Sequence, residues 1–92
     1  MFVIIAYDIP DDKRRLKMAK TLLNYGERVQ MSVFEFDMKD HDELNSLVKR
    51  IKKIYHENTD RLRIYTLCED CKNKVEIFGH GELTVDEDLI IF

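Results

Sequence analysis

Asp8 is the residue whose type and position most directly suggest chemistry. It follows the apolar run Phe2–Tyr7, which predicts a buried strand, and a carboxylate at the end of such a strand is held rigidly. Carboxylate oxygens bind Mg²⁺ or Mn²⁺, which can neutralise charge and activate water in phosphodiester hydrolysis. One aspartate is too few to hold such an ion, whereas two copies meeting at a two-fold axis would make a minimal site. The simpler alternative is that Asp8 begins a turn or helps to cap a helix.

Basic and hydroxyl side chains near Asp8 are candidate contacts to nucleic-acid phosphate. Arg14, Arg15 and Lys17 follow shortly after the end of the strand, and Arg28 begins the next alternating segment. Gln30 and Ser32 are expected on the same strand face as Arg28, where they can donate a hydrogen bond to phosphate or orient water. Each basic residue also has the alternative of a solvated surface position, which is the commoner fate of such a side chain.

Cys68 and Cys71 are spaced as in half of a zinc site or a redox motif. No second Cys/His pair lies at zinc-finger spacing, and no thioredoxin-like βαβ context surrounds the two cysteines. The sequence therefore favours a structural, reduced turn, and the role of the pair stays open.

Apolar spacing predicts the elements that position these side chains. A helix is expected over residues 11–25, with Gly26 ending it in a left-handed conformation. Residues 27–36 alternate as in a strand or a closely paired hairpin. Asp40 and Glu43 have capping-box spacing before a second helix that extends to residue 55. Further strands are expected over 61–66, 75–78 and 89–92.

This order is the βαββαβ plan of a ferredoxin-like α+β fold with an antiparallel sheet. Two helices on one face leave the other face of the sheet bare, so we expect a second copy to pack against it sheet to sheet. The extra strand over 89–92 is expected to pair with an open sheet edge. One domain spans 1–92, with a core over about 1–78 and a C-terminal segment, 79–92, that docks on the partner subunit.

Size and composition agree with one small globular domain. The chain has 92 residues, of which 45% are hydrophobic and 36% charged, and so short a chain often completes its core by pairing with a copy of itself. The net charge of −3 argues against coating nucleic acid by bulk electrostatics, although a local basic face remains compatible with it. The first residues lack the features of a signal peptide and no apolar run is long enough to cross a bilayer, so we expect a cytoplasmic location and no membrane partner.

Three segments together resemble the Cas2 family of CRISPR-associated proteins. A hydrophobic strand ends in Tyr7-Asp8-Ile9 and is followed by an acidic helix start and Arg14-Arg15. Residues 26–35 read Gly-Glu-Arg-Val-Gln-Met-Ser-Val-Phe-Glu, and residues 62–68 read Leu-Arg-Ile-Tyr-Thr-Leu-Cys, similar to the family's fourth strand. The resemblance spans nearly the whole chain, and residues 28–34 carry its strongest signal.

The resemblance implies a ferredoxin-fold homodimer in which Asp8 faces its twin across the dimer axis and binds a divalent metal, Mg²⁺ or Mn²⁺. The family includes metal-dependent ribonucleases and deoxyribonucleases, and it also serves as the scaffold that holds a short DNA duplex for the integrase subunit in spacer acquisition. Arg15 and Arg28 lie in the matched motifs, whereas Lys17 stands where an arginine is expected. A non-catalytic DNA scaffold and a related toxin-like mRNA interferase are the alternatives to an endonuclease.

Overall fold

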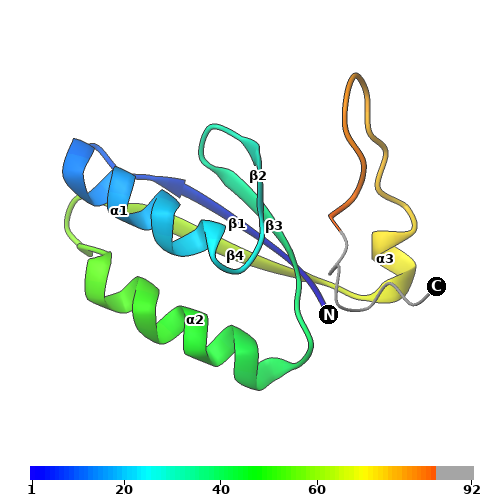
Figure 1. The fold of residues 1–92 in the computed structure, drawn as a ribbon, viewed down its shortest axis with the longest axis horizontal. Coiled ribbons are helices and arrows are strands. Elements are labelled where there is room, and N and C mark those ends of the chain that lie inside the picture. The colour runs from blue at the N-terminus through cyan, green and yellow to red at the C-terminus, as the bar shows by residue number, and fades with distance from the viewer. Residues whose placement is uncertain (85–92) are drawn as a thin grey trace.

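The structure is a computed structural model that describes residues 1–84 (Figure 1). The strand expected over 89–92 therefore lies outside the described residues, as does most of the segment 79–92 that is expected to dock on the partner subunit. The elements in chain order are β1 (Phe2–Asp8), α1 (Asp12–Leu23), β2 (Glu27–Gln30), β3 (Val33–Asp37), α2 (His41–Ile54), β4 (Arg61–Leu67) and α3 (Glu69–Lys72).

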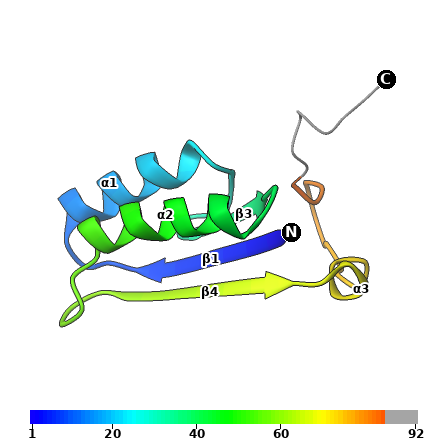
Figure 2. The same cartoon turned by 90° about the horizontal axis from the view of Figure 1, so that it is seen from below.

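The four strands form one antiparallel sheet in the order β2-β3-β1-β4. Helices α1 and α2 lie side by side on the same face of this sheet, as Figure 2 shows. The expected α+β class and βαββαβ arrangement are confirmed.

The core fills the layer between the sheet and the two helices. Alternate residues of β1, Val3, Ile5 and Tyr7, point into this layer, where they are joined by Phe34 and Phe36 of β3. The helices contribute the apolar faces that the sequence periodicity predicted, with buried residues Met18, Ala19, Leu22, Leu47, Ile51 and Ile54. Because β1 is a central strand with period-2 alternation, its other residues, including Asp8, belong to the uncovered face.

Side-chain caps fix where both long helices begin. The Asp11 carboxylate accepts a hydrogen bond from the Arg14 amide at 2.8 Å, so α1 starts at Asp12. The predicted capping box of α2 is present in part: the Glu43 amide donates to Asp40 Oδ1 at 2.9 Å, but the Glu43 carboxylate accepts from the Lys39 amide at 2.9 Å, one residue before the N-cap. These bonds satisfy amides that the helices themselves leave unpaired.

Gly26 has a different role from the one predicted. Among residues 1–84 only Gly79 and Gly81 have positive φ angles, so Gly26 does not end α1 in a left-handed conformation. It is required because a Cβ atom there would lie 2.2 Å from the Glu35 carbonyl oxygen and 2.4 Å from Cδ2 of Phe36. The glycine allows the chain leaving α1 to pass directly against β3.

The prediction of a strand over residues 75–78 is also wrong. That segment forms no strand, and its side chains Ile77 and Phe78 are 45% and 89% exposed. Strand propensity needs a neighbouring strand to be realised, and this segment has none within residues 1–84. The chain instead approaches the β2–β3 hairpin, where the hydroxyl of Thr84 contacts carboxylate oxygens of Glu27 and Glu35 at 3.4 and 3.2 Å.

Candidate metal and nucleic-acid site around Asp8

Asp8 is exposed at the end of β1, on the face of the sheet that the helices leave bare. Its cross-strand partner in β4 is Arg61, and Ala6 is paired with Arg63. Cross-strand pairs share a face, so both arginines project from the same face as Asp8, one strand away. A carboxylate and two guanidinium groups are thereby gathered on one exposed surface.

Sequence reasoning missed Arg61 and Arg63 as site residues. Their alternation with Leu62 and Ile64 was visible, but that pattern alone does not tell which strand lies beside them. The signal that could have found them is the ferredoxin-like topology, because it places the last strand antiparallel to the first and therefore the start of β4 beside the end of β1.

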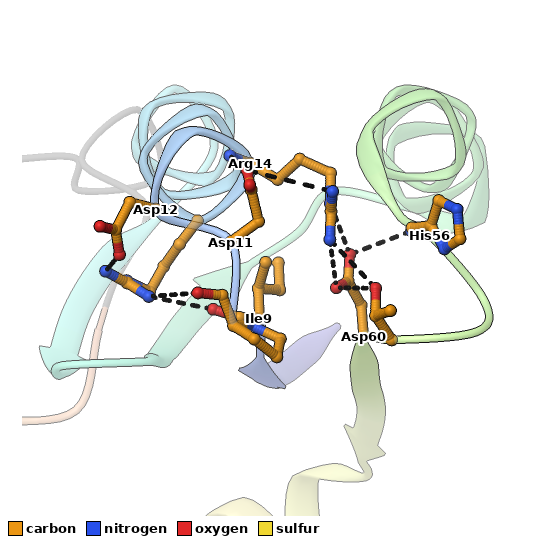
Figure 3. A network of polar contacts seen from close by, with 9 residues as sticks. Ile9, Asp11, Asp12, Arg14, His56 and Asp60 are labelled. Carbon is orange, nitrogen blue, oxygen red and sulfur yellow. Dashed lines mark hydrogen bonds and ion pairs between the residues drawn. The ribbon is translucent and has the colours of Figure 1, made fainter.

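Arg14 connects the two loops that flank this end of the sheet. Its Nη2 atom lies 2.9 Å from Asp60 Oδ1, and its Nε atom donates to Asp60 Oδ2 at 3.1 Å (Figure 3). A further bond runs from Nη2 to the hydroxyl of Thr59 at 3.0 Å. The structure thus gives Arg14, a predicted phosphate contact, a bracing role within the chain, and the bidentate geometry is the strong form of such a pair.

Asp60 was not predicted to matter, yet it is one of the few buried charged residues in the described chain, at 4% exposure. The hydrogen bond from Arg14 is the main cause that lowers the pKa of Asp60 to about 2, and bonds from the His56 amide and Thr59 act in the same direction. Burial opposes this change. The carboxylate is therefore charged and fully hydrogen-bonded at neutral pH, immediately before the strand that carries Arg61.

Arg15 contacts the chain directly after β1, at the same end of the sheet as Asp8. Its Nη1 atom donates to the carbonyl of Ile9 at 3.1 Å and to that of Pro10 at 3.4 Å, while Nη2 pairs with Asp12 (Figure 3). These bonds fix the chain directly after Asp8. Arg15 is half-exposed, and its contact with the Asp8 site is through the backbone that follows Asp8.

Ser32 lies beside the end of β1. It belongs to the turn that joins β2 to β3, and its carbonyl oxygen accepts a hydrogen bond from the Tyr7 amide at 3.1 Å. The structure therefore places the backbone of Ser32 next to the residue that precedes Asp8.

Arg28 is not gathered with Asp8. It is paired with Phe34, whose ring lies in the core, and the guanidinium carbon is 5.3 Å from the centre of that ring. A register shift between Arg28 and Gln30 corrects the expectation that these two residues share a face: Gln30 is paired with Val33, the neighbour of Phe34. Lys17 is exposed on α1.

Residues 1–84 of one chain do not contain a complete metal site. No group of three or more His, Cys, Asp or Glu side chains able to hold an ion occurs within residues 1–84. Asp8 fits a divalent cation as a single, exposed oxygen ligand, and a second copy, water or phosphate would supply further ligands.

These features define a small ferredoxin-like α+β protein with an acidic and arginine-bearing face at the junction of its first and last strands. Residues 1–75 match the family model described as CRISPR associated protein Cas2. The chain belongs to this family, as the three sequence segments indicated.

Relatives and solved structures agree with this assignment. A protein of Synechocystis sp. named CRISPR-associated endoribonuclease Cas2 3 is 49% identical over 81 residues, covering 88% of this chain and 87% of that protein. The crystal structure of Streptococcus pyogenes Cas2 at pH 6.5 superposes with a TM-score of 0.74 at 34% identity, covering 86% and 100% of the two chains. A chain of a partial Cas6-RT-Cas1–Cas2 complex gives a TM-score of 0.71 at 33% identity, covering 83% and 88%.

Within residues 1–84, no helix has both the length and the apolar character that a membrane span requires.

Proposed function

We propose that this chain is a CRISPR-associated endonuclease that hydrolyses phosphodiester bonds of RNA or DNA with a divalent metal, Mg²⁺ or Mn²⁺. The observation that carries the proposal is the exposed Asp8 at the end of a rigid central strand, on the same face as Arg61 and Arg63. The names of the relatives, endoribonuclease and endonuclease, support it. Membership in the Cas2 family favours this role over a toxin-like interferase without a CRISPR partner.

We infer a homodimer from what residues 1–84 of a single chain lack. The helices cover one face of the sheet only, and on the other face Tyr65 of β4, which is paired with Ile4, is 45% exposed. Covering this face, which carries Ile4 and Tyr65 beside the charged residues, would stabilise the sheet, and a second copy is the partner that would also supply a second Asp8. The two-fold axis would then pass near the two carboxylates.

Metal binding, phosphate binding and positioning would fall to different residues of the site. A bound Mg²⁺ or Mn²⁺ would supply charge neutralisation and an activated water. Asp8 would hold the ion, while Arg61 and Arg63 would bind phosphate oxygens and orient the strand, since a guanidinium matches phosphate in a bidentate manner. Arg15 fixes the backbone after Asp8, and the Arg14–Asp60 pair fixes the start of β4. The attack of water on a phosphodiester needs its reacting groups to be held in place, and rigid elements provide this positioning.

The test is a cleavage panel on wild type, Asp8→Asn and the matched control Asp42→Asn, which makes the same change at an exposed residue of α2. RNA, single-stranded DNA and duplex DNA are incubated with Mg²⁺, Mn²⁺ or EDTA. We expect EDTA to stop cleavage by the wild type and Asp8→Asn to lower the rate by about a hundredfold or more, because an amide oxygen binds a divalent cation far less well than a carboxylate does. Asp42→Asn should match wild type.

Light scattering after size exclusion accompanies the panel and should report a dimer for all three proteins. Metal-dependent cleavage retained by purified Asp8→Asn would contradict the catalytic role, and a stable monomer at assay concentration would contradict the shared site.

A scaffold role without catalysis is the second candidate. It is favoured by the fold similarity to a chain within a complex that also contains Cas1, and by the lack of a complete metal site in the described chain. In this case the protein would hold duplex DNA for the integrase subunit. Spacer acquisition in cells would then survive Asp8→Asn and fail on loss of the arginines, whereas the endonuclease proposal, if cleavage is needed for acquisition, requires Asp8→Asn to fail as well.

A further inference from the structure

Cys68 and Cys71 lie where the chain leaves the sheet, directly after β4. Both are exposed, so neither contributes to the apolar core. The Cys71 amide donates to the sulfur of Cys68 at 3.4 Å, and the Lys72 amide donates to the Cys68 carbonyl at 2.8 Å, which closes a single tight turn. The reduced turn expected from the sequence is therefore present, with both thiols open to reagents in solution.

We propose that Cys68 and Cys71 form a redox-active dithiol that exchanges with small-molecule disulfides of the glutathione type and closes to an intramolecular disulfide. Cys68 is the N-cap residue of α3 and its sulfur lies over the amide of Cys71, the third residue of that helix, so the fold brings the two cysteines together on one turn. This inference is independent of the nuclease chemistry at Asp8.

The surroundings distinguish the two sulfurs. Hydrogen bonds from the Cys71 amide and then from the Cys71 thiol lower the pKa of Cys68, because they stabilise its thiolate. The pKa of Cys71 is raised, chiefly because its thiol proton is engaged by Cys68. Since the thiolate is the nucleophile in exchange reactions, Cys68 is the attacking residue and Cys71 the resolving one.

The reaction proceeds in two balanced steps. The Cys68 thiolate attacks one sulfur of oxidised glutathione, forming a mixed disulfide and releasing one glutathione thiolate. Cys71 then loses its proton to solvent and attacks the Cys68 sulfur, which forms the Cys68–Cys71 bond and releases the second glutathione thiolate. The protein gives up two electrons, and one oxidised glutathione becomes two reduced molecules.

A soft-metal site is the competing use of two cysteines, but it needs further ligands. No cluster of three or more potential ligands includes these residues in the part of the chain that the structure describes. An exposed pair of cysteines that can close one short disulfide ring fits thiol–disulfide exchange better than it fits metal binding.

The inference is tested on the full chain by mass spectrometry after incubation with oxidised glutathione at pH 7 in EDTA without oxygen. Wild type is expected to lose two hydrogens and to carry no glutathione at the end of the reaction. Cys71→Ser should accumulate one glutathione on Cys68, whereas Cys68→Ser should react several-fold more slowly. Iodoacetamide should likewise modify Cys68 in Cys71→Ser several-fold faster than Cys71 in Cys68→Ser.

The double variant Cys68→Ser/Cys71→Ser serves as the control and should show no mass change, with a circular dichroism spectrum equal to that of wild type. The inference is overturned if wild type keeps both thiols free, if it ends as a stable glutathione adduct, or if oxidation links two chains on a non-reducing gel. Equal rates for the two single variants would overturn the assignment of Cys68 as the attacking residue.

Discussion

The guanidinium of Arg14 and the buried carboxylate of Asp60 tie the start of α1 to the residue that precedes β4, with 2.9 Å between Nη2 and Oδ1 (Figure 3). The two loops that this pair joins lead from Asp8 on one side and to Arg61 on the other. The ion pair therefore acts on the candidate site through the positions of its two strands.

Removing this carboxylate should destabilise the fold. In Asp60→Ala the Arg14 guanidinium and the His56 amide lose their partner in a partly buried place, which costs more than the loss of an exposed ion pair. We expect the melting temperature to fall by about 5 °C or more. The matched control is Asp12→Ala, which removes the exposed partner of Arg15 and should lower it by less than about 2 °C. Equal effects of the two changes in thermal melts would contradict the bracing role.

The same carboxylate predicts a pH dependence of stability. The pKa of Asp60 is about 2 in the folded chain, against about 4 for an unperturbed aspartate. A lowered folded-state pKa stabilises the fold above the unfolded value, and this contribution is lost as the pH falls from about 4 to about 2. Urea unfolding of wild type and Asp60→Ala at several pH values should give a stability difference that is constant above about pH 5 and shrinks toward pH 2. A difference that does not change over this range would show that Asp60 is not the titrating group.

Much of the fold follows from local sequence patterns. The apolar run of β1, the capping box of α2 and the apolar stripes of both helices each correspond to an element in the structure. The prediction of a strand over 75–78 was wrong because a strand forms only beside a partner strand. The sequence of one segment does not tell whether a sheet edge is available to pair with it. Gly26 was assigned a left-handed conformation for a related reason: a close approach to β3 is a tertiary contact that leaves no local signal.

The candidate site was predictable as far as single residues go. Asp8 could be found because a polar residue ends a buried strand, whereas its neighbours in β4 depend on register. Arg14 illustrates the limit, because a basic residue near a site reads the same in sequence whether it binds phosphate or a buried carboxylate 46 residues away. The face of Arg28 was misjudged because a bulge in β2 changes the alternation of side chains.

Gly26→Ala tests the close approach between the end of α1 and β3. The added Cβ would meet backbone and ring atoms at 2.2 and 2.4 Å, neither of which can move without displacing β3, so we expect a loss of about 2–4 kcal/mol in the free energy of unfolding. Gly79→Ala is the control, since its Cβ would meet nothing within 4 Å and only its φ of 94° is strained, at about 1–2 kcal/mol. Chemical denaturation measures both, and a smaller loss for Gly26→Ala than for Gly79→Ala would contradict the packing argument.

The salt dependence of nucleic-acid binding tests whether Arg61 and Arg63 contact phosphate. Each phosphate contact releases counterions, so the logarithm of the binding constant falls linearly with the logarithm of salt concentration, with a slope of about −0.9 per contact on duplex DNA. Arg61→Gln and Arg63→Gln remove the charges beside Asp8, and each should make that slope shallower by about 1 for every phosphate that the variant no longer neutralises. They should leave the melting temperature nearly unchanged because both side chains are exposed. Lys52→Gln removes one charge from the exposed face of α2 and is the matched control. If Lys52→Gln flattens the slope and the arginine variants do not, the nucleic acid lies along α2 and the face around Asp8 is not where it binds.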